Sequence, residues 1–164
     1  MNITDNFTLE ELCSSDTAVS KGIDNSPCIA ERENLIKLAT TILQPARDYI
    51  GKPLRITSGF RGEKLNEAVG GSRTSQHLYG EAADIVVRTH DGIDKRAMKS
   101  LFGYLAEHAR FGQLIWEYGG RWIHVSLPSN RLSNGNGQIL TIFTSNGHKR
   151  TESINKTWRS YIGY

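Results

Sequence analysis

Two apolar segments, residues 113–117 and 122–126, are separated by only four residues, and this spacing restricts the possible folds more than any other feature. The intervening Tyr118-Gly119-Gly120-Arg121 contains consecutive glycines, which readily adopt the positive φ angles of a tight β-turn. The sequence therefore predicts an antiparallel hairpin with its turn at Gly119 and Gly120. Because an isolated hairpin is marginally stable, further strands and helices are expected to complete a sheet.

Apolar residues recur at helical spacing in two long segments, residues 29–49 and 94–109. Pro45 is expected to kink the first helix or mark a break near its end, because proline lacks the N–H that a helix interior needs. Shorter helical signals are the capping box that begins at Thr8 and the segment 63–69. Ahead of the first long helix, Pro27 is expected at the first helical position with Ser26 as its cap.

Three further strands are predicted, at residues 54–58, 83–87 and 139–143. Together these elements predict one small α+β domain, with helices packed on one side of a mostly antiparallel sheet. Within the single domain, 1–164, we expect an N-terminal arm (1–28), a core that holds the candidate site (29–127) and a C-terminal extension (128–164).

Composition indicates a globular protein of ordinary surface chemistry. Apolar residues make up 38% of the 164 residues and charged residues 23%, and the formal net charge is +3. A charge of this size would help the chain approach a polyanionic surface, but it is too small to indicate nucleic-acid binding. No segment has the length of a membrane span, and the chain is expected to be a monomer.

The start of the chain carries no signal-peptide pattern, because residues 1–6 are polar and no apolar run follows them. We therefore expect synthesis in the cytoplasm, with another route to any substrate outside the cell. The two cysteines, Cys13 and Cys28, lack the spacing of a metal site and are expected to be free, partly buried thiols, although a disulfide between them stays open.

The first candidate for chemistry is a histidine and an aspartate seven residues apart. His77 lies in a loop that ends at Gly80, and Asp84 begins an apolar strand. A carboxylate near a core is costly unless it is paired or bound to a metal, and zinc accepts both imidazole and carboxylate ligands.

A second histidine, His124, lies inside the apolar strand at residues 122–126. Either histidine alone is more often a hydrogen-bonded structural residue than a ligand. Together, His77, Asp84 and His124 form a candidate set of three ligands, which would leave a fourth position on zinc for water. Three protein ligands are typical of a catalytic zinc site rather than a structural one.

The hairpin also offers a general base. With the turn at Gly119-Gly120, Glu117 pairs with Trp122 and Ile115 pairs with His124, so Glu117 and His124 share a face of the sheet as diagonal neighbours. The alternatives are that Glu117 is a solvated acid at the end of a hairpin, or that a bulge changes the pairing.

Arg61 follows the strand-ending Ser58-Gly59, a position from which its guanidinium can enter a cleft. There it could bind a substrate carboxylate or stabilise an oxyanion, and the alternative is a surface arginine. The other histidines, His90, His108 and His148, are in a polar loop, on a helix and in the tail, and are not expected to be ligands.

These pieces resemble the D-alanyl-D-alanine carboxypeptidase type of zinc peptidase, a superfamily that includes L-alanyl-D-glutamate endopeptidases and the Hedgehog domain. The resemblance covers roughly residues 7 to 127, and it includes an N-terminal segment similar to the bacteriophage and bacterial branch. The motifs that carry it are Ser58-Gly59-Phe60-Arg61, Asn66, Gly70-Gly71-Ser72, Ser75-Gln76-His77, Gly80-Glu81-Ala82-Ala83-Asp84 and Trp122-Ile123-His124-Val125-Ser126.

The resemblance implies one zinc ion bound by His77, Asp84 and His124, with Ser75 helping to seat the substrate and Arg61 stabilising the oxyanion. We also expect Trp122 to line the substrate site. Several members carry their catalytic acid three residues before the last histidine, where this chain has Arg121. Glu117 then becomes the first candidate for that role and Glu81 the second.

The implied substrate is a peptidoglycan peptide, cut at D-Ala-D-Ala, at L-Ala-D-Glu or at a cross-link. A phage endolysin, a virion-borne enzyme and a host remodelling enzyme are all compatible with this chemistry, and the apparent lack of a signal peptide favours the endolysin. The alternative from another class is a module that keeps zinc for stability but no longer catalyses.

Overall fold

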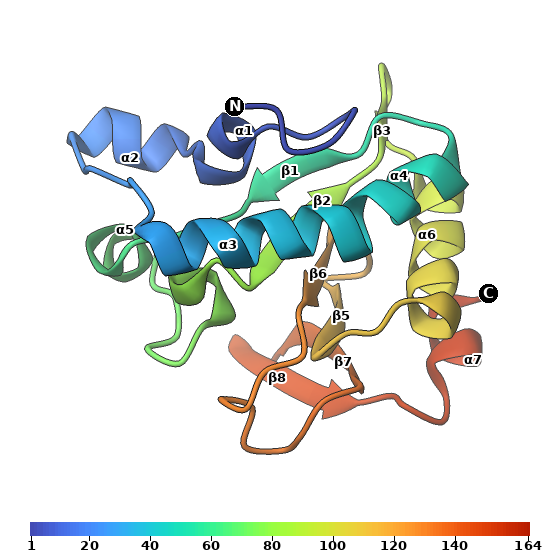
Figure 1. The fold of residues 1–164 in the computed structure, drawn as a ribbon. Coiled ribbons are helices and arrows are strands. Elements are labelled where there is room, and N and C mark those ends of the chain that lie inside the picture. The colour runs from blue at the N-terminus through green and yellow to red at the C-terminus, as the bar shows by residue number, and fades with distance from the viewer.

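The computed structural model describes all 164 residues, which form one α+β domain around a six-stranded sheet (Figure 1). The strand order is β1-β2-β6-β5-β7-β8, and every pairing is antiparallel except the parallel pair β5–β7. The six strands are β1 (Arg55–Ser58), β2 (Ala82–Val86), β5 (Gln113–Glu117), β6 (Trp122–Ser126), β7 (Gln138–Ser145) and β8 (His148–Ser153). The predicted fold class is therefore confirmed.

A second, two-stranded ribbon joins β3 (Arg88–Thr89) to β4 (Gly92–Ile93). The helical elements are α1 (Leu9–Cys13), α2 (Asp16–Lys21), α3 (Ile29–Leu38), η1 (Ala39–Leu43), α4 (Gln44–Ile50), α5 (Glu63–Ala68), η2 (Gln76–Tyr79), α6 (Lys95–His108) and α7 (Trp158–Ile162). None of the helices is both long enough and apolar enough to cross a membrane.

The long helices and the sheet bury one continuous core. Leu35 of α3 and Leu101 and Phe102 of α6 are fully buried with Ile85 of β2 and Ile123 of β6. In Figure 1, α3 and α4 run across the front of the sheet, and α6 stands at one side of it. Because side chains alternate along a strand, the residues between these core positions point to the opposite face.

The first long helix is one run with a widened turn. The segment Ala39–Leu43 is π-helical, and the N–H of Gln44 bonds to the carbonyl of Ala39. Pro45, which has no N–H to donate, is the second residue after this segment. The predicted disturbance at Pro45 therefore takes the form of a π-helical turn before the proline rather than a sharp break.

The predicted cap at Ser26 is wrong. The helix α3 begins at Ile29 with Cys28 as its N-cap, and the carboxylate of Glu31 accepts the N–H of Cys28 at 2.7 Å. The Ser26 hydroxyl is occupied by Asp24, to which it donates at 2.6 Å. Cys13 and Cys28 are both free, Cys13 half-buried and Cys28 exposed, so the expected burial of Cys28 is also wrong.

Candidate metal centre

His77 is held by a short turn that packs against the end of β1. Ser75 caps this turn, and its hydroxyl accepts the backbone N–H of His77 at 3.3 Å. The carbonyl of His77 accepts the N–H of Arg61 at 3.0 Å, which ties the turn to the segment after β1. With its ring only 1% exposed, His77 has little freedom to reorient.

The backbone of Gly59 determines which nitrogen of His77 is available. The Nδ1–H of His77 donates to the Gly59 carbonyl at 2.7 Å, so Nε2 carries a free lone pair. A Cβ atom at residue 59 would lie 2.1 Å from the carbonyl oxygen of Leu12, so only glycine fits this position. A histidine oriented in this way by a backbone carbonyl is typical of metal ligands.

Strand pairing brings the other two candidate ligands together. Asp84 on β2 lies directly opposite His124 on β6, so both side chains stand on the same face of the sheet. Their strand neighbours Ile85 and Ile123 point into the core. The alternation along each strand thus gives one face to packing and the other to the candidate ligands.

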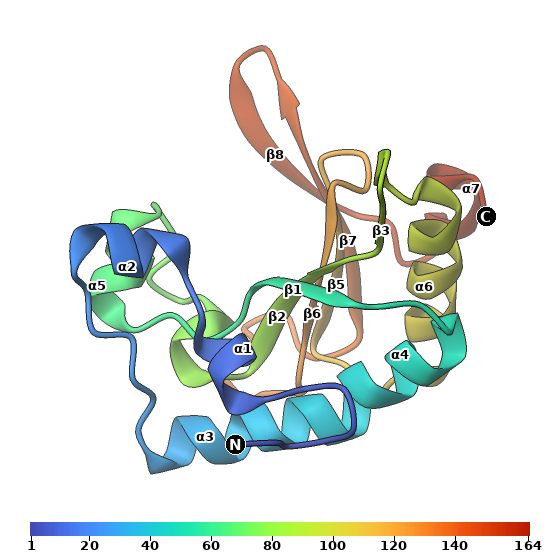
Figure 2. The same ribbon diagram turned by 90° about the horizontal axis from the view of Figure 1, so that it is seen from above.

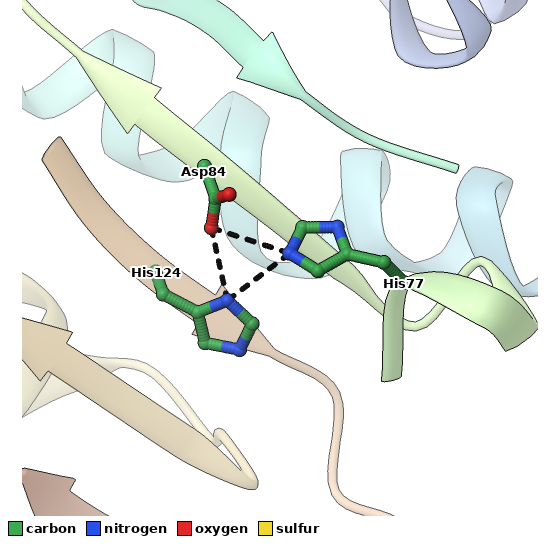
Figure 3. Close-up of side chains that lie close together, drawn as sticks. All are labelled: His77, Asp84 and His124. Carbon is green, nitrogen blue, oxygen red and sulfur yellow. Dashed lines mark hydrogen bonds and ion pairs between the residues drawn. The ribbon is translucent and has the colours of Figure 1, made fainter. Parts of the chain in front are cut away.

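The three side chains converge on a small triangle (Figure 3). His77 Nε2 lies 3.3 Å from Asp84 Oδ1 and 3.2 Å from His124 Nδ1, and the third side, between His124 Nδ1 and Asp84 Oδ1, is 2.9 Å. In Figure 3 the triangle stands in front of β2 and β6, with the pale cyan long helix behind the sheet.

Burial and mutual charge set the protonation of this cluster. Burial lowers the pKa of His77, which keeps the ring neutral near pH 7. Burial alone would raise the pKa of Asp84, but its close contacts with the imidazoles of His77 and His124 lower it far below the ordinary value. An ionised carboxylate beside a neutral imidazole is in the state that binds a divalent metal.

The geometry fits one zinc ion. Ligand atoms at about 2.0–2.1 Å from zinc in tetrahedral arrangement lie roughly 3.3 Å from one another. The three measured separations, 2.9, 3.2 and 3.3 Å, are close to that spacing. His77, Asp84 and His124 would therefore hold the ion from three sides, and the fourth position would be open to water or substrate.

Comparison with known protein families matches residues 5–126 to the family described as Peptidase M15. The chain belongs to the peptidase M15 family. The match includes both candidate histidines and Asp84, so it confirms the resemblance seen in the sequence.

A relative from Streptomyces albus G is described as a zinc D-Ala-D-Ala carboxypeptidase. It is 39% identical to this M15 chain over 83 residues, which are 49% of this chain and 31% of the relative. The chain thus covers about a third of the length of that relative, and the likeness supports zinc as the metal of this family's site.

Glu117 lies beside the cluster as the hairpin register predicts. It pairs with Trp122, and Ile115 pairs with His124, without a bulge between them. Glu117 and His124 are therefore diagonal neighbours on one face of the sheet, with about 7–8 Å between their backbone positions across the two strands. Burial raises the pKa of the Glu117 carboxyl, and the charge of Asp84 raises it further.

Arg61 lines a cleft that reaches the cluster. The cleft has a volume of about 360 Å³ and includes Arg61 and Asp84 among its walls. The guanidinium is half-buried, its Nε has no hydrogen-bond partner, and burial lowers the pKa of Arg61. The lining also includes residues 14–17, the turn after α1 and the start of α2, which was not foreseen from the sequence.

The remaining sequence candidates fall in different places. Trp122 lies on the same face as Glu117 and packs against Tyr118 with ring centroids 5.3 Å apart. Glu81, the second candidate base, is bonded to Gln76 at 3.1 Å and to Arg131 at 2.5 Å, so its carboxylate is already engaged.

The three histidines not expected to be ligands are away from the metal cluster. His90 is exposed and pairs with Asp91, His108 bonds to the carbonyl of Tyr104, and His148 lies exposed on β8. The residue that sequence reasoning missed is Gly59, whose carbonyl orients His77. The sequence shows Gly59 two residues before Arg61, but it does not show the direction in which the Gly59 carbonyl points.

Proposed function

We propose that this M15 chain hydrolyses peptide bonds in the stem peptides or cross-links of bacterial peptidoglycan, with one zinc ion bound by His77, Asp84 and His124. The observation that carries the proposal is the convergence of these three ligand atoms beside Glu117 on one sheet face. The wall-peptide substrate is supported by the relative described as a zinc D-Ala-D-Ala carboxypeptidase.

Zinc bound at this site would polarise the scissile carbonyl and lower the pKa of a water molecule. The chain's own contribution begins with Glu117, whose carboxylate takes the proton of the attacking water. The protonated Glu117 then donates that proton to the leaving amine. Its place two residues from the turn, diagonal to His124, lets one side chain serve both transfers.

Arg61 stabilises the developing oxyanion or holds a substrate carboxylate from the cleft side. Its half-buried guanidinium and unpartnered Nε leave donors free for such a group. Trp122 supplies an aromatic surface next to Glu117 for the substrate chain. Ser75 helps to seat the substrate next to His77, whose backbone N–H its hydroxyl accepts.

The biological setting we propose is a phage endolysin that reaches the wall after release from the cytoplasm of its host. The resemblance of the N-terminal segment to the bacteriophage and bacterial branch supports this setting. Lysis of host cells from within, only in the presence of a membrane pore, would distinguish an endolysin from a virion-borne enzyme or a wall-remodelling enzyme.

The decisive experiment is digestion of purified peptidoglycan by the zinc-loaded protein, with released fragments identified by mass spectrometry. We expect defined peptides or D-Ala from the wild type. His124→Ala should lose both zinc and activity, because it removes a ligand. Glu117→Gln should keep zinc and lose at least about a hundredfold in rate, the lower range for a general base.

Glu152→Gln is the matched control, since Glu152 is an exposed acid on β8 and should retain full activity. If the wild type binds zinc tightly yet releases nothing from any wall type, the peptidase proposal fails. The chain would then be a zinc-stabilised binding module.

A further inference from the structure

The C-terminal hairpin continues the face that carries the candidate site. Glu117 on β5 is level with Ile142 on β7, and Ile142 is opposite Thr151 on β8. Thr144, two residues beyond Ile142, is opposite Lys149. Since paired residues and residues two apart share a face, Lys149 stands on the same face as Glu117 and His124.

Lys149 and its neighbour Arg150 point to opposite faces. Both are exposed, and Lys149 takes part in no ion pair. Its positive charge is close enough to lower the pKa of Glu117, although burial and Asp84 outweigh it. In Figure 2 the β7–β8 hairpin projects from the body on the side away from α3 and α4.

The positive charge of the chain is concentrated in this C-terminal part. Residues 127–164 contain five basic residues and one acid, whereas residues 1–126 contain 15 basic residues and 16 acids. The hairpin also lies outside residues 5–126, the segment that matches the M15 family. The hairpin itself, residues 138–153, contains two basic residues, Lys149 and Arg150, and one acid, Glu152, and it is an addition to the segment that matches the family.

We propose that the β7–β8 hairpin is an accessory substrate-binding arm, in which Lys149 pairs with a carboxylate on the leaving portion of the peptide. This inference rests on the proposed peptidase function. In that function Glu117 protonates the leaving amine, so the leaving portion lies over β5 and runs toward β7 and β8. Arg61, on the β1 side, faces the other portion.

The sheet geometry gives the position of that carboxylate. The strand β8 is three strand spacings from β6, or about 14 Å at about 4.8 Å each. Lys149 also lies four residues along β8 from Ser153, the residue level with His124, which adds an offset of about 13 Å at about 3.3 Å per residue. Together the two offsets separate the backbone positions of His124 and Lys149 by about 19 Å. An extended chain covers about 3.3 Å per residue, and the lysine side chain shortens the gap. The carboxylate is therefore expected roughly four residues beyond the cut bond, which favours an endopeptidase over removal of a single terminal residue.

The test uses two synthetic stem-type peptides that differ only in glutamate or glutamine about four residues beyond the cleaved bond. Wild type, Lys149→Gln and Arg150→Gln, all zinc-loaded, are compared at low ionic strength. The wild type should prefer the glutamate peptide by roughly threefold in KM with kcat unchanged, the size of an exposed ion pair. Arg150→Gln removes the same charge from the opposite face and should keep this preference.

Lys149→Gln should abolish the preference, and Lys149→Glu should reverse it. A preference that survives in Lys149→Gln, or that Arg150→Gln removes equally, would overturn the inference while leaving the peptidase function intact. Calorimetric binding of the same peptides to the zinc-loaded proteins separates the two ideas. If the peptides bind with a selectivity that depends on Lys149 but are not cleaved, the peptidase function is wrong and the carboxylate site at Lys149 stands. If the peptides are neither bound nor cleaved, both proposals are wrong.

Discussion

At the scale of single residues, a backbone carbonyl controls the chemistry of the candidate metal centre. Gly59 accepts the Nδ1–H of His77 and thereby directs Nε2 toward Asp84 and His124. Such contacts to the far nitrogen of a ligand fix its tautomer and raise its basicity. The ligand set therefore depends on a residue that has no side chain.

We expect Gly59→Ala to weaken zinc binding by about 10- to 100-fold, the range seen when a contact behind a ligand is lost. The new Cβ would overlap the carbonyl of Leu12 and force the 59–60 segment away from His77. Competition with a zinc chelator gives the affinity. Gly62→Ala is the control, because its Cβ has 3.5 Å of space and its φ is −60°; equal affinity in both variants would contradict the role of Gly59.

At the scale of elements, alternation along the strands allows the same segment to build the core and the site. Ile123 and Val125 pack inward while Trp122 and His124 stand on the other face. A shift of one residue in the β5–β6 pairing would turn the core residues of β6 toward the site and the site residues toward the core. The turn at Gly119 and Gly120, both with positive φ, fixes the register and so keeps Glu117 beside His124.

This register explains what could be predicted from the sequence. Periodicity and a two-glycine turn define local pairing, so the hairpin and the shared face of Glu117 and His124 were predictable. The strand β8 was not predicted because it is a fully exposed, charged edge strand without an apolar alternation. Its turn, Asn146-Gly147 with both φ angles positive, is nevertheless a typical hairpin signal that was overlooked.

Other features depend on contacts between distant segments. The six-residue helix α2 is too short to show periodicity, although Ser15 caps it through the N–H of Ala18 at 3.2 Å. The cleft wall at residues 14–17 and the Gly59 carbonyl contact are products of packing. Sequence patterns describe neighbours along the chain and therefore contain no direct record of these approaches.

The N-cap of α6 leads to a prediction with a pH dependence. Asp94 accepts the N–H of Ala97 at 3.0 Å and the ammonium of Lys52 at 2.7 Å, and these contacts, the Lys52 bond first, lower its pKa. A carboxyl whose pKa is lowered by folding stabilises the protein above its unfolded pKa of about 3.9, and this contribution is lost as the pH falls below it.

We therefore expect the Tm at pH 6 to decrease from wild type to Asp94→Asn to Asp94→Ala, because asparagine keeps a capping acceptor and alanine does not. On lowering the pH through 4 to 3, the advantage of the wild type over Asp94→Asn should shrink. Thermal unfolding followed by circular dichroism measures both effects. Asp91→Asn, in the adjacent exposed loop, serves as control, and a constant gap at all pH values would argue against the role of the Asp94 charge.

At the scale of the whole molecule, the N-terminal arm, the central part and the C-terminal extension share one hydrophobic core. Phe7 of the N-terminal arm, Leu35 of the central part and Trp158 near the C-terminus all belong to the same buried cluster. Trp158 of α7 packs against Phe102 of α6 with ring centroids 6.0 Å apart. The C-terminal extension is thus a structural part of the domain in addition to carrying the basic hairpin.

We expect Trp158→Ala to lower the free energy of unfolding by about 3–5 kcal/mol, the usual effect of removing a large buried aromatic side chain. Urea unfolding should still show a single transition, because the cavity opens in the shared core. Val19→Ala, at a residue that is 82% exposed, should change stability little. A two-step transition in Trp158→Ala, with only the first step shifted, would show that the C-terminal part unfolds separately.

The central position of β6 has a consequence for the order of events during synthesis. β6 inserts between β2 and β5, and it delivers His124, the last of the three candidate ligands to leave the ribosome. Until that strand is in place, His77 and Asp84 offer only two donors, too few for a tetrahedral ion bound by three protein groups. Stable capture of the ion therefore marks the pairing of β6 with β2, a step that does not require β7 or β8, and a nascent chain that stalls before it remains without its metal.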